Sequence, residues 1–269
     1  MRTPFRKMHG LGNDFIVIDA RARAVVMSNA RAAALADRRT GIGCDQLIVL
    51  EPSEIADVRM RIFNADGGEV EACGNASRAV GLLLGGEQRI ETLGGTIASS
   101  AGADGVSVDM GMPRFDWDAI PLAYAMDTLT MPVGWEDLSD PTAVNVGNPH
   151  VIFFVPDCDA VDLARLGPVI ETDPLFPARV NVNVASVVGS DHLRLRVWER
   201  GVGLTRACGT GACATAIGAM RRKLVGRTTR VDLPGGTLTI AWREDGSILM
   251  TGPAATSFEG TFEDSDFPA

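Results

Sequence analysis

Hydrophobic and polar residues alternate along much of the chain, which predicts many short strands separated by turns. Gly-Gly and Asp-Gly pairs inside the longer segments mark hairpins, so the sheets should be mostly antiparallel. The expected strand-rich segments are residues 15–21, 46–52, 58–67, 89–111, 143–155, 179–189, 192–201 and 230–252.

Helices are fewer, and four segments predict them: residues 28–39, 75–84, 159–167 and 210–224. The first begins on a capping Ser or Asn, and the third should end at Gly167. The helices at 75–84 and 210–224 are small or apolar on nearly all sides over their first two turns. A helix without a polar face is enclosed by other elements. We therefore expect strands to surround each of these two helices.

The two enclosed helices follow similar motifs, EACGNAS at 71–77 and RACGTGA at 206–212. In each half of the chain, strands, a polar turn, the motif, the helix and hairpins follow one another in the same order. This predicts an approximate duplication in an α+β fold. We expect one domain to span residues 1–115, joined by the C-terminal segment 255–269, and the other to span residues 116–254.

Composition argues against several kinds of partner. The net charge of −9 and a pI near 4.9 oppose binding to nucleic acid or to an anionic membrane, because either partner needs a basic face. No apolar run approaches the roughly 20 residues that cross a bilayer. The amino terminus lacks the apolar segment of a secretory signal. We expect a cytoplasmic protein.

No motif for a metal or an organic cofactor is present. The five cysteines and three histidines show no Cys-x-x-Cys or His-x-x-x-His spacing, so neither a zinc module nor a disulfide framework is expected. The chain has only two lysines, Lys7 and Lys223, and neither has a plausible setting for a pyridoxal phosphate Schiff base. Phosphate-loop and dinucleotide fingerprints are missing. Protein side chains should therefore perform any chemistry without a cofactor or a metal.

Cys73 and Cys208 stand at the mouths of the two enclosed helices. Free N–H groups and partial positive charge at a helix start favour an anion, which predicts a lowered thiol pKa and a cradle for a carboxylate. A single cysteine there is more often a small buried hydrophobic residue. Two copies, one in each half, suit inversion at a carbon centre, since one thiolate removes a proton and the opposite thiol delivers one.

At these residues the sequence closely resembles the diaminopimelate epimerase family. The resemblance covers nearly the whole chain and is carried by six motifs: KMHGLGNDF (7–15), GIGCDQL (41–47), FNADGGEVEACGN (63–75), VGNPHVIFF (146–154), NVNV (181–184) and VWERGVGLTRACGTGACA (197–214). It implies two pseudo-symmetric domains, each a β-barrel around a central helix, with the active site in the cleft between them. It implies a cofactor-independent enzyme that interconverts LL- and meso-diaminopimelate in lysine and peptidoglycan precursor biosynthesis.

The resemblance also implies a role for individual residues. Cys73 and Cys208 would be the acid and base, and His150 and Glu199 would adjust their pKa values. Glu199 and the region of Arg200 would receive the α-ammonium group, and the Arg200 side chain would pair with the distal carboxylate. The remaining substrate-binding positions are Asn13, Gln46, Asn64, Gly74, Asn75, Asn148, Asn181, Gly209 and Thr210. The family usually forms homodimers, so we expect one here.

Other functions remain open at this point. A racemase of proline or hydroxyproline could share the architecture, but it would leave Arg200 and three asparagines unexplained. A non-catalytic amino-acid-binding protein would not require both thiols. A thiol oxidoreductase is disfavoured without Cys-x-x-Cys. Taken singly, His150 and the asparagines are often turn or structural residues, and Cys44, Cys158 and Cys213 are expected to be ordinary packing residues.

Overall fold

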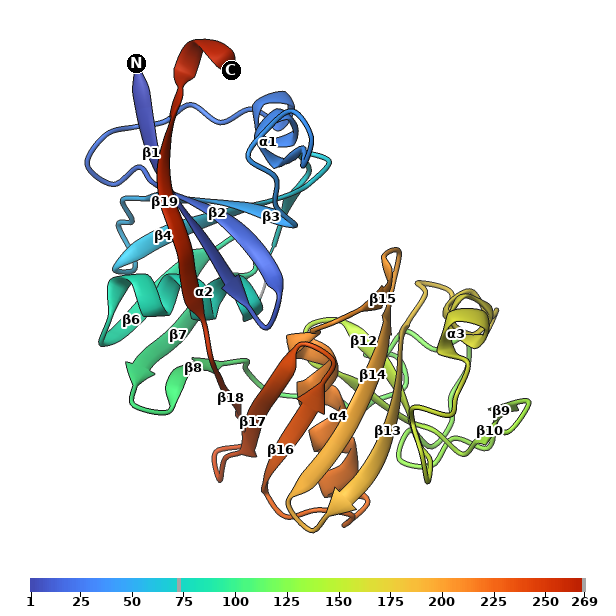
Figure 1. The fold of residues 1–269 in the computed structure, drawn as a ribbon. Helices are drawn as coiled ribbons and strands as arrows, with labels where there is room; N and C mark the ends of the chain where they lie inside the picture. The colour runs from blue at the N-terminus through green and yellow to red at the C-terminus, as the bar shows by residue number, and fades with distance from the viewer. Residues whose placement is uncertain (72–73, 268–269) are drawn as a thin grey trace. The chain divides into compact units, whose positions relative to one another are not determined.

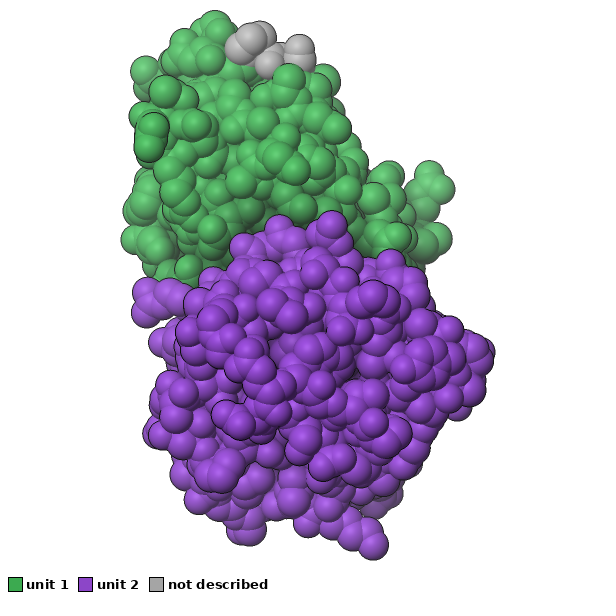
Figure 2. Space-filling view, turned by 90° about the vertical axis from the view of Figure 1, so that its right-hand side faces the viewer, with its two compact units in different colours: residues 1–108, 252–269 green, residues 109–251 purple. Residues whose placement is uncertain are grey.

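A computed structural model describes residues 1–71 and 74–267 of the chain. It divides into two units, which Figure 2 colours separately. Unit 1 contains residues 1–108 and 252–269, and unit 2 contains residues 109–251. These limits lie a few residues before the predicted boundaries at 115 and 254. That these two units are the two predicted domains stays a prediction.

Unit 1 consists of strands around one enclosed helix, with a second helix outside (Figure 1). Strand β1 pairs antiparallel with β19 and β2, β2 pairs parallel with β3, and β3 pairs antiparallel with β4. Strand β4 pairs antiparallel with β5 and parallel with β6, and β6, β7 and β8 form an antiparallel meander. The elements are β1 (Arg2–Gly10), β2 (Asn13–Asp19), α1 (Asn29–Ala36), β3 (Gln46–Glu51), β4 (Val58–Asn64), β5 (Glu69–Val70), α2 (Gly74–Leu84), β6 (Glu87–Thr92), β7 (Gly95–Gly102), β8 (Gly105–Asp109), β19 (Ala255–Glu263) and a 3₁₀ turn (Asp264–Asp266).

Unit 2 has its own strands around its own enclosed helix. Strand β11 pairs antiparallel with β12, β12 pairs parallel with β13, and β13 pairs antiparallel with β14. Strand β14 pairs antiparallel with β15 and parallel with β16, and β16, β17 and β18 form an antiparallel meander. The elements are β9 (Gly134–Trp135), β10 (Leu138–Ser139), β11 (Thr142–Asn145), β12 (Pro149–Phe154), α3 (Leu163–Glu171), β13 (Asn181–Gly189), β14 (His192–Glu199), β15 (Gly203–Thr205), α4 (Gly209–Arg221), β16 (Thr228–Leu233), β17 (Gly236–Trp242) and β18 (Ile248–Gly252).

The pairings of β1 to β8 recur, in the same order and with the same directions, from β11 to β18. Helix α2 lies between β5 and β6, as α4 lies between β15 and β16. The hairpins after these helices also correspond. Gly95 and Gly236 begin the second strand of each, with φ of 118° and 140°, a backbone region that favours glycine. The predicted α+β duplication is therefore confirmed.

The two predicted enclosed helices are indeed surrounded by strands. Helix α4 contacts β11, β12, β13, β14, β16 and β17, and α2 contacts β1, β2, β6, β7 and β19. Small residues allow this close approach. A Cβ atom at Gly81 of α2 would lie 2.7 Å from Val106, and one at Gly218 of α4 would lie 3.3 Å from Thr142. Among the described residues, no helix combines the length and apolar character of a membrane crossing.

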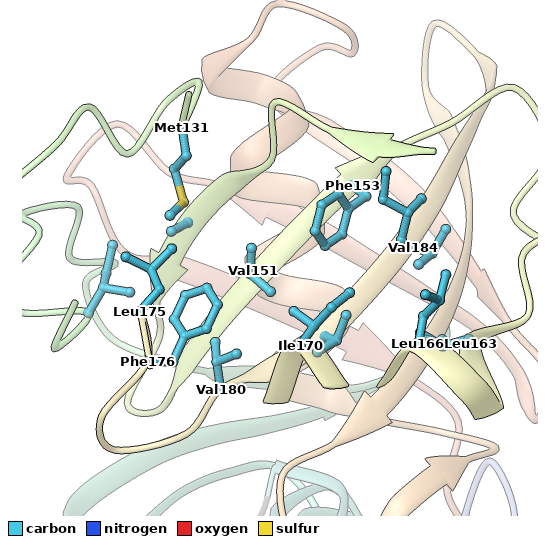
Figure 3. Close-up of a cluster of buried hydrophobic side chains, with 14 of the residues drawn as sticks. Met131, Val151, Phe153, Leu163, Leu166, Ile170, Leu175, Phe176, Val180 and Val184 are labelled. Carbon is cyan, nitrogen blue, oxygen red and sulfur yellow. The ribbon is translucent and has the colours of Figure 1, made fainter. Parts of the chain in front are cut away.

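A hydrophobic cluster of unit 2 packs on one face of β12 and β13 (Figure 3). Val151 and Phe153 reach it from β12, and Val182 and Val184 reach it from β13. Side chains alternate between the two faces of a strand, so the residues between these four point to the opposite face. Much of the rest of the cluster comes from α3 and the segment after it: Leu163, Leu166, Ile170, Leu175, Phe176 and Val180.

Two local expectations were wrong. Helix α3 was expected at 159–167, but it begins after the N-cap Asp162 and continues through Pro168 to Glu171. Gly167 does not end the helix. It leaves room for Trp198, since a Cβ there would lie 2.5 Å from the indole ring. Strand β1 was not expected at all, because polar residues interrupt its apolar pattern.

Candidate active site

Cys208 is the N-cap residue of α4, directly before the first helical residue. It is 3% exposed, and its Sγ accepts a hydrogen bond from the backbone N–H of Gly211 at 3.3 Å. The hydroxyl oxygen of Thr210 lies 3.5 Å from the same sulfur. Unpaired N–H groups and the helix dipole stabilise negative charge at this point. The position suits a sulfur that exchanges a proton next to a bound carboxylate.

The pKa of Cys208 is raised well above its usual value. Burial is the largest cause, because it disfavours the thiolate, and the nearby Glu199 carboxylate raises this pKa further. Donors from Thr210 and from the Gly211 N–H lower it, as the helix position predicted, but they do not compensate. The predicted lowering of this pKa is therefore wrong. The raised pKa favours the protonated thiol, which is the form that can donate a proton.

His150 is completely buried on β12. Its Nδ1 lies 3.0 Å from the amide nitrogen of Asn183, and its Nε2 lies 2.9 Å from the amide oxygen of Asn148. Burial lowers the pKa of His150 to about 3. The charge of Arg200 also lowers this pKa, and the Asn183 hydrogen bond opposes the shift. The imidazole is therefore neutral at physiological pH and carries no charge that could change the pKa of a neighbouring group.

Glu199 and Arg200 stand where β14 ends and its turn begins. The backbone N–H of Arg200 donates to the amide oxygen of Asn181 at 2.9 Å, and the Asn181 amide nitrogen donates to the Pro149 carbonyl at 2.8 Å. Both groups of this asparagine thus bind backbone and hold the turn. The exposed Arg200 side chain donates from Nη1 to the Ala178 carbonyl at 3.0 Å. No ion pair is recorded for it among the described residues.

A buried carboxylate that sequence analysis missed anchors the same turn. Glu171, at the end of α3, is 5% exposed and accepts hydrogen bonds from the Gly201 N–H at 2.9 Å and from the Trp198 indole at 2.7 Å. The Nη1 atom of Arg179 lies 3.6 Å from Oε1, the same carboxylate oxygen that accepts from Gly201. Nothing in the sequence connects this glutamate to a turn that follows a later strand.

Removing the Glu171 carboxylate is expected to destabilise the fold. Glu171→Ala leaves the Gly201 N–H and the Trp198 indole without their charged acceptor, so the free energy of unfolding should fall by about 2–4 kcal/mol. Urea unfolding followed by tryptophan fluorescence measures it. The matched control is Glu136→Ala, which removes an exposed partner of Arg165 on the same helix and should change nothing measurable. An equal fall in the free energy of unfolding of both variants would contradict a stabilising role of Glu171 at this turn.

Unit 1 gathers its predicted residues by hydrogen bonds between amides. Asn75, in the first turn of α2, donates to the Asn13 amide oxygen at 3.2 Å and accepts from Arg78, a fully buried guanidinium, at 2.8 Å. Asn13 in turn donates to Asp45 at 3.0 Å. Arg78 and Asp45, which sequence analysis did not select, therefore fix the orientation of two predicted substrate-binding amides.

Corresponding ends of the two units carry the predicted residues. Gln46 begins β3 and donates to Asn64, which ends β4, at 3.0 Å. In unit 2, Asn181 begins β13 and Glu199 ends β14. Unit 1 holds Asn13, Gln46, Asn64, Gly74 and Asn75, and unit 2 holds Asn148, His150, Asn181, Glu199, Arg200, Cys208, Gly209 and Thr210. The other predicted thiol, Cys73, lies outside the described residues.

One group of possible metal ligands occurs in the described part of the chain: Asp157, Cys158 and Asp159. Arg194 donates to the Asp159 carboxylate at 3.1 Å, and Arg196 donates to the Cys158 carbonyl at 3.0 Å. Two guanidinium groups at the cluster favour ion pairing over cation binding. Cys44, Cys158, Cys208 and Cys213 are buried and form no disulfide.

The fold resembles that of several solved structures. A phenazine biosynthesis protein of the PhzF family from Enterococcus faecalis has a TM-score of 0.73 at 15% identity, over 98% of this chain and 100% of that one. A hydroxyproline epimerase from Agrobacterium vitis has a TM-score of 0.67 at 15% identity, over 97% and 91%. At these identities the likeness establishes the fold, a two-domain α+β architecture.

Sequence comparison gives a much closer relationship. The family model described as diaminopimelate epimerase matches residues 5–115 and 142–257. The diaminopimelate epimerase of Erythrobacter litoralis is 69% identical over 99% of this chain and 100% of its own. That of Zymomonas mobilis is 58% identical over the same shares. The chain therefore belongs to the diaminopimelate epimerase family.

Proposed function

We propose that the chain interconverts LL-2,6-diaminopimelate and meso-2,6-diaminopimelate by proton transfer at one α-carbon, without a cofactor. Membership of the family supports the activity. The observation that carries the chemistry is the buried thiol of Cys208 at the mouth of α4, beside the Glu199 carboxylate. This activity places the chain in the biosynthesis of lysine and of peptidoglycan precursors.

Cys73 and Cys208 exchange protons with opposite faces of the substrate carbon. In one direction the Cys73 thiolate takes the α-proton, the C–H bond breaks, and its electron pair remains on carbon. The S–H bond of Cys208 then breaks as its proton forms a new C–H bond on the other face. The raised pKa of Cys208 supports the role of donor in this direction, and the reverse reaction exchanges the two roles.

The helix mouths stabilise the charge that develops on the α-carboxylate. Backbone N–H groups at Gly209 and Thr210, and at Gly74 and Asn75, lie in the first turns of their helices and point toward the N-terminal end of each helix. Oriented N–H groups in a low-dielectric setting lower the energy of a carbanion that is delocalised into a carboxylate. Glu199, held at the end of β14, receives the α-ammonium group.

Amides and one guanidinium recognise the distal half of the substrate. Arg200 has further donors for a carboxylate, because its hydrogen bond to the Ala178 carbonyl uses only Nη1. Asn64 and Asn148 supply amide groups for the same half of the substrate, and Asn181 holds the Arg200 backbone in place. Asn13 and Gln46 line the pocket. Their hydrogen bonds to Asp45 and Asn64 hold both amides in fixed orientations.

The proposal extends to the setting in which the enzyme works. The acidic composition supports a cytoplasmic location. Membership of a family that usually forms homodimers supports a homodimer. Size-exclusion chromatography with light scattering tests the dimer, and a monomer at micromolar concentration would contradict it.

Solvent deuterium tests the two-thiol reaction. The enzyme is equilibrated in heavy water and given LL-diaminopimelate, and both isomers are recovered after a few per cent of conversion. We expect the meso product to carry deuterium at its inverted carbon, while the recovered substrate carries none, since a separate thiol delivers the new hydrogen. Equal labelling of substrate and product would indicate a single base. Trans-4-hydroxyproline should not be turned over, and its turnover would favour the rival racemase.

A further inference from the structure

Asn183 lies on the face of β13 opposite the hydrophobic cluster and is completely buried. Its amide nitrogen has two partners, the Nδ1 atom of His150 at 3.0 Å and the carbonyl oxygen of Val151 at 3.3 Å. Its amide oxygen has no hydrogen-bond partner among the described residues. A Cβ atom at Gly211, in the first turn of α4, would lie 2.9 Å from that oxygen. Asn183 therefore lies directly beneath the helix mouth.

The Val151 carbonyl fixes the orientation of the Asn183 amide. A carbonyl only accepts hydrogen bonds, so it requires the amide nitrogen on its side. Turning the amide over would bring its oxygen against the carbonyl oxygen. The same nitrogen then donates to Nδ1 of His150, which must be unprotonated. The single proton of the neutral imidazole is therefore on Nε2.

The remaining hydrogen bonds connect the His150 tautomer to the direction of the hydroxyl hydrogen beside the Cys208 sulfur. His150 Nε2–H donates to the Asn148 amide oxygen at 2.9 Å, which turns the Asn148 amide nitrogen toward the Thr210 hydroxyl, 3.3 Å away. Because that hydroxyl accepts a bond from Asn148, its own hydrogen is free for the Cys208 sulfur at 3.5 Å. From Asn183 to Thr210 each donor in the series points toward the Cys208 sulfur, and the bond from Asn183 to the Val151 carbonyl points the other way.

We propose that Asn183 is a positioning residue that holds His150 as its Nε2–H tautomer and so directs the Thr210 hydroxyl toward the Cys208 sulfur. The importance of this for catalysis rests on the proposed role of Cys208, but the arrangement itself can be tested without turnover. With the other tautomer, Asn148 would have to turn over. Thr210 would then donate to Asn148, and the sulfur would lose a donor that favours its thiolate.

Two charged groups act on the series, and both stand where β14 ends and its turn begins. Glu199 faces Cys208 and raises its pKa, and the charge of Arg200 lowers the pKa of His150. His150 itself is neutral. A change made at Asn183 therefore alters hydrogen bonding around the sulfur without altering a charge.

Long-range ¹H–¹⁵N correlation on protein labelled at histidine nitrogen reports the tautomer directly. His150 is identified as the signal missing from His150→Gln. We expect a neutral ring with its proton on Nε2 at pH 7 that remains neutral at pH 5.5. A proton on Nδ1, or a cation at pH 5.5, would overturn the proposal. This measurement uses the unaltered protein and does not depend on whether a variant folds.

Alkylation of Cys208 by iodoacetamide, followed by mass spectrometry of its peptide, tests the effect on the sulfur. Asn183→Leu and Thr210→Val should each raise the pH midpoint of the reaction by about 0.5–1 unit, the effect of losing one hydrogen bond. The double variant should shift no further than the larger single shift, since both changes remove the same donor. Shifts that add, or no shift in Asn183→Leu, would overturn the proposal.

Ser186→Ala is the matched control for these variants. Ser186 lies on the same strand, is 7% exposed, and accepts a hydrogen bond from the Cys158 N–H at 2.7 Å. Its loss should lower stability while leaving the His150 tautomer and the Cys208 midpoint unchanged. An equal change in this control would mean that the effect of Asn183 is general destabilisation. If diaminopimelate is not turned over but these results hold, the proposed function fails and the positioning role remains.

Discussion

A Cys208→Ala variant is expected to lose epimerisation by about three to four orders of magnitude, because it removes one of two proton-transferring groups. The fold should persist, since alanine fits the space of a buried cysteine and only weak hydrogen bonds to the sulfur, from the Gly211 N–H and the Thr210 hydroxyl, are lost. The rate of conversion of LL- to meso-diaminopimelate by chiral chromatography measures the loss, and circular dichroism checks the fold. Cys158→Ala, which also removes a buried free thiol, should keep its activity within about twofold.

The stereochemistry of the remaining exchange gives a sharper result than the rate. With Cys208 gone, Cys73 can still remove an α-proton from the isomer whose hydrogen faces it and can return a deuteron to the same face. We expect Cys208→Ala to exchange the α-hydrogen of only one configuration in heavy water, with retention. Cys73→Ala should exchange the other. Exchange of both configurations at equal rates in either variant would contradict an arrangement of one thiol on each face.

The sequence was enough to predict the duplicated fold, because its signals are local and occur twice. The two cysteine motifs, the small-residue helices after them and the Gly-Gly hairpins all lie within short windows. Strand β1 was missed because its long, partly polar sequence is stabilised by pairing with β19 from the other end of the chain. The end of α3 was missed because Gly167 serves packing against Trp198, which no local rule reveals.

The position of Cys208 at a helix mouth could also be predicted, but the direction of its pKa could not. Helix capping is decided by neighbouring residues, whereas burial and the Glu199 charge depend on how strands enclose the helix. Asn183 illustrates the same limit. The NVNV motif places two asparagines on one face of a strand, but only the tertiary structure shows that the second one contacts His150. Glu171 reaches its turn from another element altogether.

Replacing Arg200 by methionine is expected to lower kcat/KM for diaminopimelate by about 100-fold or more, mostly through a higher KM, since the guanidinium binds a carboxylate remote from the reacting carbon. Arg200→Lys should recover only part of the loss, because an ammonium group lacks the two-pronged geometry that suits a carboxylate. Initial rates over a range of substrate concentrations separate KM from kcat. Removing the charge should also let the pKa of His150 rise, since Arg200 lowers it.

Arg194→Met is the control for the loss of an arginine. Arg194 lies on β14, which ends just before Arg200, and its exposed side chain pairs with Asp159, so its variant should keep both constants within about twofold. A fall in kcat with an unchanged KM in Arg200→Met would contradict distal binding. Losing a contact that is made only in the transition state lowers kcat and leaves substrate affinity unchanged. The relative changes in KM and kcat thus decide whether Arg200 binds the distal carboxylate or assists at the α-carbon, where we propose that Glu199 and Cys208 act.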